Sequence, residues 1–457
     1  MPPSAAQLTS FSLESLPIGA KLGRILSAAL QAVDPAAAVR NHLSRHGTLL
    51  ISDDVKYDLR DFNCIYIVAI GKAGVPMASA AGAVLGNHLT RGLALVKYGH
   101  AFSAYTHPNI KILEAGHPYS DANSIAGTQQ ILALLSNLQK SDLVICLISG
   151  GGSALFSAPA PGITLQDMHA LMRLLFVCGA RIDEINTLRK HIDTVKGGGL
   201  TRWISPAAAL TLILSDVVGD SLDTIASGPT SPDPTTFLQA WEILHKYNLV
   251  EQTAPAIIEH IRRGIAGQIP ETPKPGACLF QNTHHVLVGS NKQAAEAAIR
   301  QANAEGFNTL LQTTTQQGEA NKIGAQMATI ANHIRTTGQP ISPPACIIAG
   351  GETTVTIRGN GLGGRNQECA LGAAMTLAGQ KNVVFISLAS DGGDGPTDAA
   401  GAVATGETID RARQLGLDPV DYLDRNDSYH FFEPLEDLIK TGPTMTNVND
   451  LMALVVY

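Results

Sequence analysis

Short apolar runs recur along the chain, and each ends in a glycine-rich or Asp/Ser turn that leads into an alanine-rich amphipathic stretch. Such a run predicts a buried strand, and the stretch after it predicts a helix. Alternating strands and helices are typical of α/β domains with parallel sheets. The clearest runs are CIYIVAIGKAG at 64–74, DLVICLISGGGSA at 142–154, ALTLILSDVVGD at 209–220, HHVLVGSNKQ at 284–293, ACIIAGGE at 345–352 and NVVFISLASDGGDG at 382–395. Because ligands of such sheets bind beyond the carboxyl ends of the strands, we expect the functional site among these turns.

The proline-rich segment QIPETPKPGA at 268–277 is the best candidate for a domain boundary, since its prolines interrupt both helix and sheet. At 457 residues the chain is longer than a single core usually supports. We predict one domain over 1–275 and a second over 276–457, with the active site in the cleft between them. Repeats of fixed period and long low-complexity tracts do not occur in the sequence, which argues against a solenoid.

Composition and charge narrow the class of protein. Charged residues make up 16% of the chain and hydrophobic residues 45%, which favours buried sheets. A net charge of -7, without a stripe of Lys and Arg that could neutralise a phosphate backbone, argues against a nucleic-acid partner, although a basic pocket is still possible. The six cysteines are scattered without a C-x-x-C pair, and no apolar run is long enough to span a membrane. We expect a cytoplasmic enzyme, monomeric or homodimeric, without a membrane partner.

The segment ISGGGSALF at 148–156 follows a strongly apolar strand. Its glycines let successive backbone N–H groups converge on a phosphate or carboxylate, and its serines add hydroxyl donors. The alternative is a tight turn that needs glycine only for backbone freedom. The candidate anion-binding residues here are Ser149, Gly150, Gly151, Gly152 and Ser153.

Lys72 comes directly after the strand that precedes this loop in the sequence, flanked by glycine and alanine. A cation at that point would suit a transferring phosphoryl group. The spacing differs from a Walker A element, because no Ser or Thr follows the lysine. A lysine that extends to solvent at a helix start is the alternative.

The segment TLRKHIDTVKGGGL at 187–200 concentrates basic side chains ahead of three glycines. In a chain with so few charges, this predicts an anionic ligand. A solvated helix face with a glycine cap is the alternative. The candidate ligand-binding residues are Arg189, Lys196, Gly197 and Gly198.

Carboxylates follow two of the predicted strands, in LSDVVGD and in ASDGGDGPTDAAG. Magnesium prefers oxygen ligands of this kind and completes its shell with water and phosphate. Aspartates also cap helices and form turns, and this explains some of them. The candidate nucleotide or metal residues are Asp216, Asp220, Asp391 and Asp394; Asp398 lies in the same second segment.

The segment RGNGLGGRNQE at 358–368 formally contains the G-x-G-x-x-G pattern, but no acidic residue follows at the spacing of a ribose-binding carboxylate. Arg365 instead offers a planar donor fork for phosphate or carboxylate. Farther on, TGPTMTNVNDL at 441–451 is a polar loop whose Asn447 and Asn449 either close over a nucleotide or metal or form an Asx turn.

Taken together and in this order, the segments GKAG, SGGGSAL, HIDTVKGGGL, LSDVVGDSLDTIASGPTSPD, GGETTVTIRGNGLGGRNQE, ASDGGDGPTDAAG and TGPTMTNVND resemble the class II glycerate kinases, whose C-terminal half is the MOFRL domain. The resemblance implies two Rossmann-like, three-layer α/β/α domains with mostly parallel sheets. It implies that ATP with Mg²⁺ phosphorylates D-glycerate on the 2-hydroxyl.

The resemblance also assigns roles to residues. It implies that Lys72 and Arg365 are catalytic. It also implies that the glycine-rich loops and Asn366 bind the substrate and the phosphate groups. Met445 departs from the family pattern, which usually has glycine there, and this affects how closely a ligand can approach the loop.

Members of the family often carry the name hydroxypyruvate reductase, so an NAD(P)H-dependent oxidoreductase is the rival hypothesis. A non-catalytic protein that binds sugar acids is a third, and it leaves the aspartate clusters without a purpose.

Overall fold

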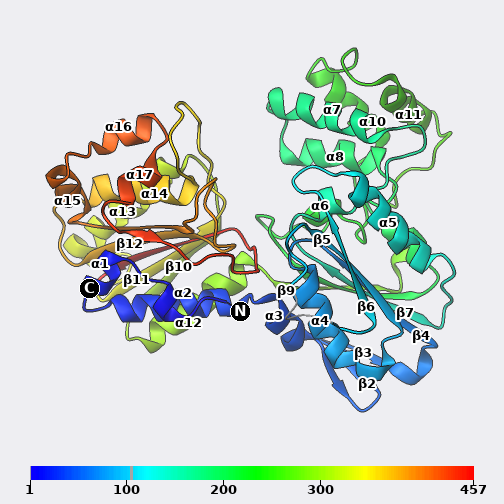
Figure 1. The fold of residues 1–457 in the computed structure, drawn as a ribbon, viewed down its shortest axis with the longest axis horizontal. Helices are drawn as coiled ribbons and strands as arrows, with labels where there is room; N and C mark the ends of the chain where they lie inside the picture. Colours follow the sequence, from blue (N-terminus) through cyan, green and yellow to red (C-terminus); the bar gives the residue numbers. More distant parts are fainter. Residues whose placement is uncertain (1, 103–106) are drawn as a thin grey trace. The chain divides into compact units, whose positions relative to one another are not determined.

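The computed structural model describes residues 2–102 and 107–457, and the chain divides into two units that each contain a six-stranded sheet (Figure 1). Residues 35–288 form one unit, called here the Lys72 unit. Residues 2–34 and 289–457 form the other, called here the Arg365 unit. The α/β class and the two-unit organisation predicted from the sequence are confirmed.

This division differs from the predicted break at 275 in two respects. Residues 2–34 belong to the Arg365 unit, where Ser12 N donates to Asp437 Oδ1 at 2.8 Å and Lys21 Nζ to the Glu305 carbonyl at 2.7 Å. The strand after the proline-rich segment forms the edge of the Lys72 sheet, so the chain leaves that unit only at Gly289. Composition marks a break in regular structure, but it does not reveal which distant segments pack together.

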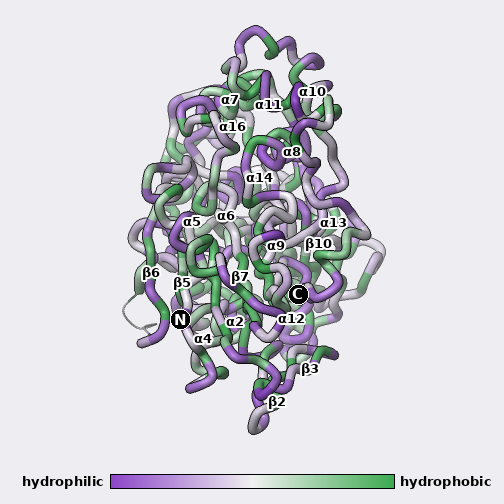
Figure 2. The backbone as a smooth tube through the Cα atoms, turned by 90° about the vertical axis from the view of Figure 1, so that its right-hand side faces the viewer, coloured by the Kyte–Doolittle hydropathy of each residue, from purple (hydrophilic) through white to green (hydrophobic). Residues whose placement is uncertain are grey.

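The sheet of the Lys72 unit has the order β6-β5-β4-β7-β8-β9, and its β4–β5, β4–β7, β5–β6 and β7–β8 pairs are parallel. These strands are β4 (Cys64–Ile70), β5 (Arg91–Lys97), β6 (Ile110–Ala115), β7 (Asp142–Ile148), β8 (Ala208–Leu214) and β9 (Thr283–Gly289). A small antiparallel sheet consists of β1 (Ser44–His46), β2 (Leu49–Ser52) and β3 (Val55–Asp58). β7 is buried along its whole length and appears green, or hydrophobic, in Figure 2.

Helices cover both faces of this sheet. Val68, Leu93 and Cys146 point to the face covered by α5 and α9, while Ala69 and Val96 contact Gly74 of α4 on the other. The helices α7, α8, α10 and α11 form a separate apolar cluster beside the sheet (Figure 1). The helices are α3 (Pro35–His42), α4 (Gly74–Leu85), α5 (Ala122–Leu135), α6 (Gly152–Leu155), α7 (Leu165–Val177), α8 (Ile182–Ile192), α9 (Gly199–Ile204), α10 (Phe237–Lys246) and α11 (Pro255–Ile265).

The sheet of the Arg365 unit has the order β10-β11-β15-β12-β13-β14, and only the β10–β11 pair is parallel. The prediction of mostly parallel sheets is therefore wrong for this unit. Segment 390–400, which joins β12 to β13, is too short for a helical crossover, so the chain returns antiparallel. The strands are β10 (Asn308–Gln316), β11 (Ala345–Gly351), β12 (Val383–Ala389), β13 (Gly401–Thr405), β14 (Leu438–Ile439) and β15 (Asp450–Val456).

In this unit α2 and α12 lie on one face of the sheet and α13 and α14 on the other (Figure 1). The helices are α1 (Phe11–Ser15), α2 (Gly19–Ala32), α12 (Asn291–Ala304), α13 (Ala320–Thr337), α14 (Arg365–Leu377), α15 (Thr408–Gln414), α16 (Pro419–Asp424) and α17 (Ser428–Phe432). Among the described residues, no helix has both the length and the apolar character needed to cross a bilayer.

Candidate active site

Lys72 lies in the turn between β4 and α4, against the loop that follows β7. Its backbone N–H donates to the Gly150 carbonyl at 2.9 Å, and the next N–H, of Ala73, donates to Ser149 Oγ at 3.0 Å. Gly71 has φ +119, and a Cβ atom there would lie 2.3 Å from the Ser149 carbonyl oxygen, so only glycine fits. Because β4 and β7 are parallel neighbours, their carboxyl ends bring Lys72 and the glycine-rich loop together.

The glycine-rich loop presents backbone donors. Within the described part of the chain, the N–H groups of Gly150, Gly151 and Gly152 have no hydrogen-bond acceptor. A Cβ atom on Gly150 would lie 2.2 Å from Oδ2 of the Asp216 side chain, so a larger residue at position 150 would require that carboxylate to move. Ser153 Oγ lies 2.8 Å from Ser227 Oγ. The arrangement fits an anion-binding turn.

The loop opens onto a pocket of about 470 Å³ in the Lys72 unit. Gly151, Ser153, Arg189 and Lys196 line it, together with apolar side chains of α7 such as Met172. Four of the predicted ligand-binding residues thus face one cavity.

Arg189 is a cation without a carboxylate partner among the described residues. Its Nη1 donates to Asn186 Oδ1 at 3.4 Å and its Nε contacts Met172 Sδ at 3.3 Å. Burial lowers the pKa of Arg189, but a guanidinium stays charged at neutral pH. A partly buried, uncompensated charge facing a cavity points to an anionic ligand.

Lys196 is held by the protein on one side. Its ammonium donates to the Ser153 and Phe156 carbonyls at 2.8 and 2.7 Å and lies 3.8 Å from Asp193. Burial lowers the pKa of Lys196, and the Asp193 carboxylate opposes that shift. The lysine therefore fixes the turn around α6 while it lines the pocket.

The two glycines that follow Lys196 have a backbone role. The N–H groups of Gly197 and Gly198 donate to the Ser227 and Gly228 carbonyls at 2.9 and 2.7 Å, so these amides are not presented to a ligand. Nearby, Lys190 pairs with Asp223 at 2.9 Å and Asp233 at 3.3 Å. Part of the basic cluster at 187–200 is therefore structural.

Of the two predicted aspartates after β8, Asp216 lies close to this site. Asp216 contacts the Gly150 position, because β7 and β8 are neighbours. Asp220 has φ +55 and its N–H donates to the Val217 carbonyl at 3.1 Å, as in a turn. Among the described residues, no group of three or more metal-ligating side chains occurs.

Arg365 is the first helical residue of α14 in the other unit. Its Nε and Nη2 donate to the two oxygens of Asp450 at 2.6 and 3.0 Å, and its Nη1 donates to Glu352 at 2.9 Å. Burial acts to lower the pKa of Arg365, but Asp450 and Glu352 raise it above the usual value. Three of the five guanidinium donors are thus engaged, and two are left.

Asp394 caps α14 from the side. Its carboxylate accepts from the N–H groups of Asn366 and Gln367 at 3.1 and 2.9 Å, and Asn366 Nδ2 also donates to Asp450 at 3.0 Å. Burial raises the pKa of Asp394 to about 6, partly offset by these hydrogen bonds. Its oxygens serve the helix end, which favours capping over metal binding.

The remaining predicted residues of this unit stabilise turns. Asp391 Oδ1 accepts from Gly393 N at 3.2 Å, and Asn447 Oδ1 accepts from Asn449 N at 3.2 Å. Asn449 is buried with φ +65, and Met445, in the same loop, has φ +72. The Asx-turn alternative describes these contacts.

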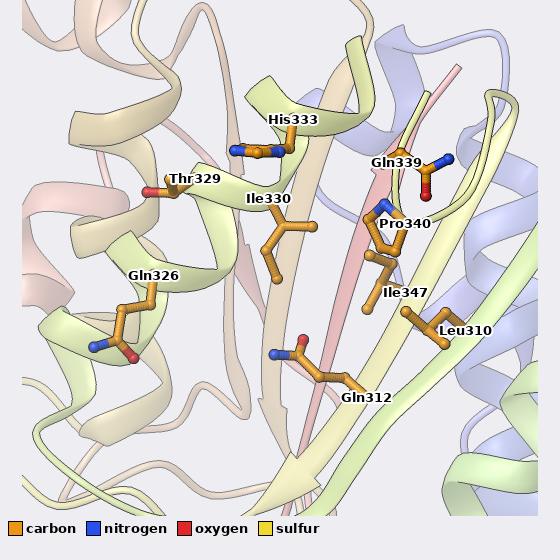
Figure 3. Close-up of a pocket in the computed structure, with 9 residues that line it drawn as sticks. All are labelled: Leu310, Gln312, Gln326, Thr329, Ile330, His333, Gln339, Pro340 and Ile347. Atoms are coloured by element: carbon orange, nitrogen blue, oxygen red, sulfur yellow. The ribbon is translucent and has the colours of Figure 1, made fainter. Parts of the chain in front are cut away.

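A hollow of about 460 Å³ also lies in the Arg365 unit, between α13 and the strands β10 and β11 (Figure 3). Its lining is neutral or apolar apart from the imidazole of His333; Gln312, Gln326, Thr329 and Ile330 are examples. Without a lysine or arginine it is a poor site for a phosphate.

Sequence reasoning missed His117, which lines the Lys72 pocket. The signal was available, because β6 ends at Ala115 and a glycine and this histidine follow at the same edge of the sheet.

Comparison with known proteins gives matches over both units. Residues 21–262 match the model of a domain of unknown function, DUF4147, and residues 345–450 match the MOFRL family. A glycerate 2-kinase of Pyrococcus horikoshii is 40% identical over 434 residues, which cover 95% of this chain and 96% of the relative. A putative hydroxypyruvate reductase of Agrobacterium vitis is 39% identical over 438 residues, and the alignment covers 95% of this chain and 94% of the relative.

A crystal structure of a glycerate kinase from Thermotoga maritima has a similar fold. The two structures align with a TM-score of 0.84 at 38% sequence identity, and the alignment covers 95% of this chain and 98% of the Thermotoga chain.

Proposed function

This chain belongs to the family of glycerate 2-kinases that combine DUF4147 and MOFRL regions, and we propose that it transfers the terminal phosphoryl group of ATP to the 2-hydroxyl of D-glycerate. The products are 2-phosphoglycerate and ADP. The observation that carries the proposal is a pocket lined by Arg189 and Lys196 beside a glycine-rich loop whose amides have no acceptor among the described residues, in a chain 40% identical to a glycerate 2-kinase over nearly its whole length.

Phosphoryl transfer needs little covalent chemistry from the protein, because alignment and neutralisation of negative charge lower most of the barrier. In the Lys72 unit, the amides of Gly150, Gly151 and Gly152 and the charges of Arg189 and Lys196 would hold anionic groups of the substrates. Lys72 supplies a positive charge at the same loop.

Arg365 would stabilise charge on the transferring group with its two remaining N–H donors. Asp450 and Glu352 fix the plane of the guanidinium, so its direction is set before substrate binds. Asn366 and Asp394 support that arrangement by holding Asp450 and the end of α14.

Of the predicted metal residues, Asp216 suits Mg²⁺ best, because its carboxylate lies beside the amides of the glycine-rich loop. Magnesium is commonly held by one or two carboxylates plus substrate phosphates. When bound, it would neutralise phosphate charge.

The rival function, NAD(P)H-dependent reduction of hydroxypyruvate, fits the structure poorly. The glycines of the formal dinucleotide pattern pack against other backbone: a Cβ atom on Gly359 would lie 2.4 Å from the Arg425 carbonyl oxygen. The first N–H groups of α14 are already taken by Asp394, and a second carboxylate, Asp450, lies next to them. A pyrophosphate would meet negative charge where that pattern normally offers free donors.

A coupled assay tests the function. Purified protein with D-glycerate, ATP and magnesium should give a product that enolase consumes directly. Hydroxypyruvate with NADH should give no absorbance change. A product that enolase accepts only after phosphoglycerate mutase is added would overturn the 2-hydroxyl assignment, and NADH oxidation without a phosphorylated product would overturn the kinase.

A further inference from the structure

The pocket of the Lys72 unit is lined by a histidine, His117, that has no part in the phosphate binding proposed for the glycine-rich loop and the cations. His117 lies two residues beyond the end of β6. A Cβ atom on Gly151 would lie 3.1 Å from His117 Nε2 and 3.2 Å from Lys72 Cγ. The Nε2 edge of the ring therefore faces the anion-binding loop beside Lys72.

The other histidines of this neighbourhood are engaged. His169 lines the same pocket, and its Nε2 lies 2.8 Å from the Ser120 carbonyl oxygen. His100 Nδ1 lies 2.9 Å from the Lys72 carbonyl oxygen. Neither ring nitrogen of His117 has a hydrogen-bond partner among the residues that the structure describes. His117 is thus available to a bound substrate.

Burial and the surrounding cations keep the ring of His117 neutral. Burial, followed by Lys72, Lys97 and His100, lowers the pKa of His117 to about 4. Arg189, Lys196 and His169 line the same pocket, and Asp216 lies at the Gly150 side of the loop. A neutral imidazole has one unprotonated nitrogen that accepts a proton.

Binding of substrates changes this balance. Anionic groups beside Lys72 offset the cations that depress the pKa of the ring, so the pKa of His117 rises by the part of the shift that these cations cause, while burial continues to lower it. A general base is most effective when its pKa lies near the pH at which the enzyme works. The imidazole would become an effective base when the anions are in place.

On the basis of the proposed function, we propose that His117 is the general base for the reacting hydroxyl group. Nε2 accepts the hydroxyl proton while the substrate oxygen forms its bond to the γ-phosphorus. The bond from that phosphorus to the β,γ-bridging oxygen breaks, and its electron pair leaves with ADP. The imidazolium then releases the proton to water.

Substitution of His117 tests this role. His117→Gln should lower kcat for 2-phosphoglycerate formation by about 10²–10⁴-fold, with little change in the KM values for glycerate and ATP. The acidic limb of the pH profile of kcat should disappear. Thermal melting, measured for every variant, sets an assay temperature at which all of them are folded.

Chemical rescue separates a base from a purely structural side chain. Added imidazole should restore part of the kcat of His117→Ala, in proportion to the neutral imidazole present. The control variant is His169→Gln, which should keep the acidic limb and gain nothing from imidazole. A His117→Gln enzyme with wild-type kcat, or a slow His117→Ala enzyme that imidazole does not rescue, would overturn the base. A wild-type enzyme that makes no phosphoglycerate would instead overturn the proposed function.

Discussion

Asp450 binds Arg365 through both carboxylate oxygens while it is itself fully buried. Burial raises the pKa of Asp450, and Arg365 and Asn366 oppose that shift. Strand β15, the last in the sequence and a central strand of the sheet, thus fixes the direction of the proposed catalytic arginine. This pair gives the first of five predictions.

Asp450→Asn should weaken both stability and turnover. Removing one partner of a buried pair leaves the other poorly compensated, which typically costs about 3–5 kcal/mol when both are fully buried and less for the partly exposed Arg365. Thermal melting and kcat measure the two effects. Glu352→Gln is the control, because its more exposed side chain should change the melting temperature little. Equal melting curves for Asp450→Asn and the wild type would contradict the prediction.

Lys72→Met should reduce kcat by about 10²–10⁴-fold and leave the fold intact, because its contacts with the loop are made by the backbone. Steady-state kinetics and thermal melting check both parts. Lys140→Met, an exposed lysine of the same unit, should behave like the wild type. Full activity in Lys72→Met would favour a lysine that merely extends to solvent.

Arg189→Met should separate binding from stability. The guanidinium is partly buried and has no carboxylate partner among the described residues, so replacing it with an apolar side chain should leave the melting temperature unchanged or higher. The KM for an anionic substrate should rise. A variant that melts earlier and binds normally would show that Arg189 is structural.

Asp394→Asn should change how stability depends on pH. Folding raises the pKa of this carboxyl from 3.8 to about 6. Ionisation of Asp394 therefore lowers the stability of the folded protein by on the order of 3 kcal/mol. This loss of stability is absent below about pH 4 and complete above about pH 6. The stability of the variant relative to the wild type should rise across that window, as urea unfolding at several pH values would show. If the difference in unfolding free energy between the variant and the wild type is the same at every pH, Asp394 is not a cause of the pH dependence of stability.

Met445→Gly should stabilise the loop. Met445 has φ +72, a conformation that costs L-residues about 1–2 kcal/mol, whereas glycine adopts it freely but loses more chain entropy on folding. A gain of up to about 1 kcal/mol is expected. Met375→Gly, in the last turn of helix α14, should instead lose up to about 1 kcal/mol. Loss of stability in Met445→Gly would mean that the side-chain contacts of Met445 outweigh its backbone strain.

The sequence predicted the parts of the site that depend on neighbouring strands. Lys72 and Gly150 follow apolar runs that form adjacent parallel strands, so their proximity is a consequence of the strand pattern. The periodicity did not reveal that β15 inserts antiparallel between β11 and β12, because a buried strand looks the same in either direction.

Roles that depend on partners distant in sequence were also out of reach. Asp394 and Asp216 look alike in sequence, but one lies at the amino end of α14 and the other beside a glycine-rich loop. Likewise, Lys190 and Arg189 are adjacent, yet within residues 2–102 and 107–457 only Lys190 has carboxylate partners, Asp223 and Asp233. Such differences arise from packing, which composition does not encode.

Because residues 2–34 pack in the Arg365 unit, they cannot complete their folding until the C-terminal part of the chain has been synthesised. The ribosome makes α2 before the Lys72 unit, yet the helix that covers it, α12, begins only at Asn291. At about 5–20 residues per second, α2 waits roughly 13–50 s for that partner. During this interval Leu22, Ile25 and Leu26, which are buried in the finished protein, lack their covering helix. A nascent chain stalled before α12 emerges would therefore expose the apolar face of α2.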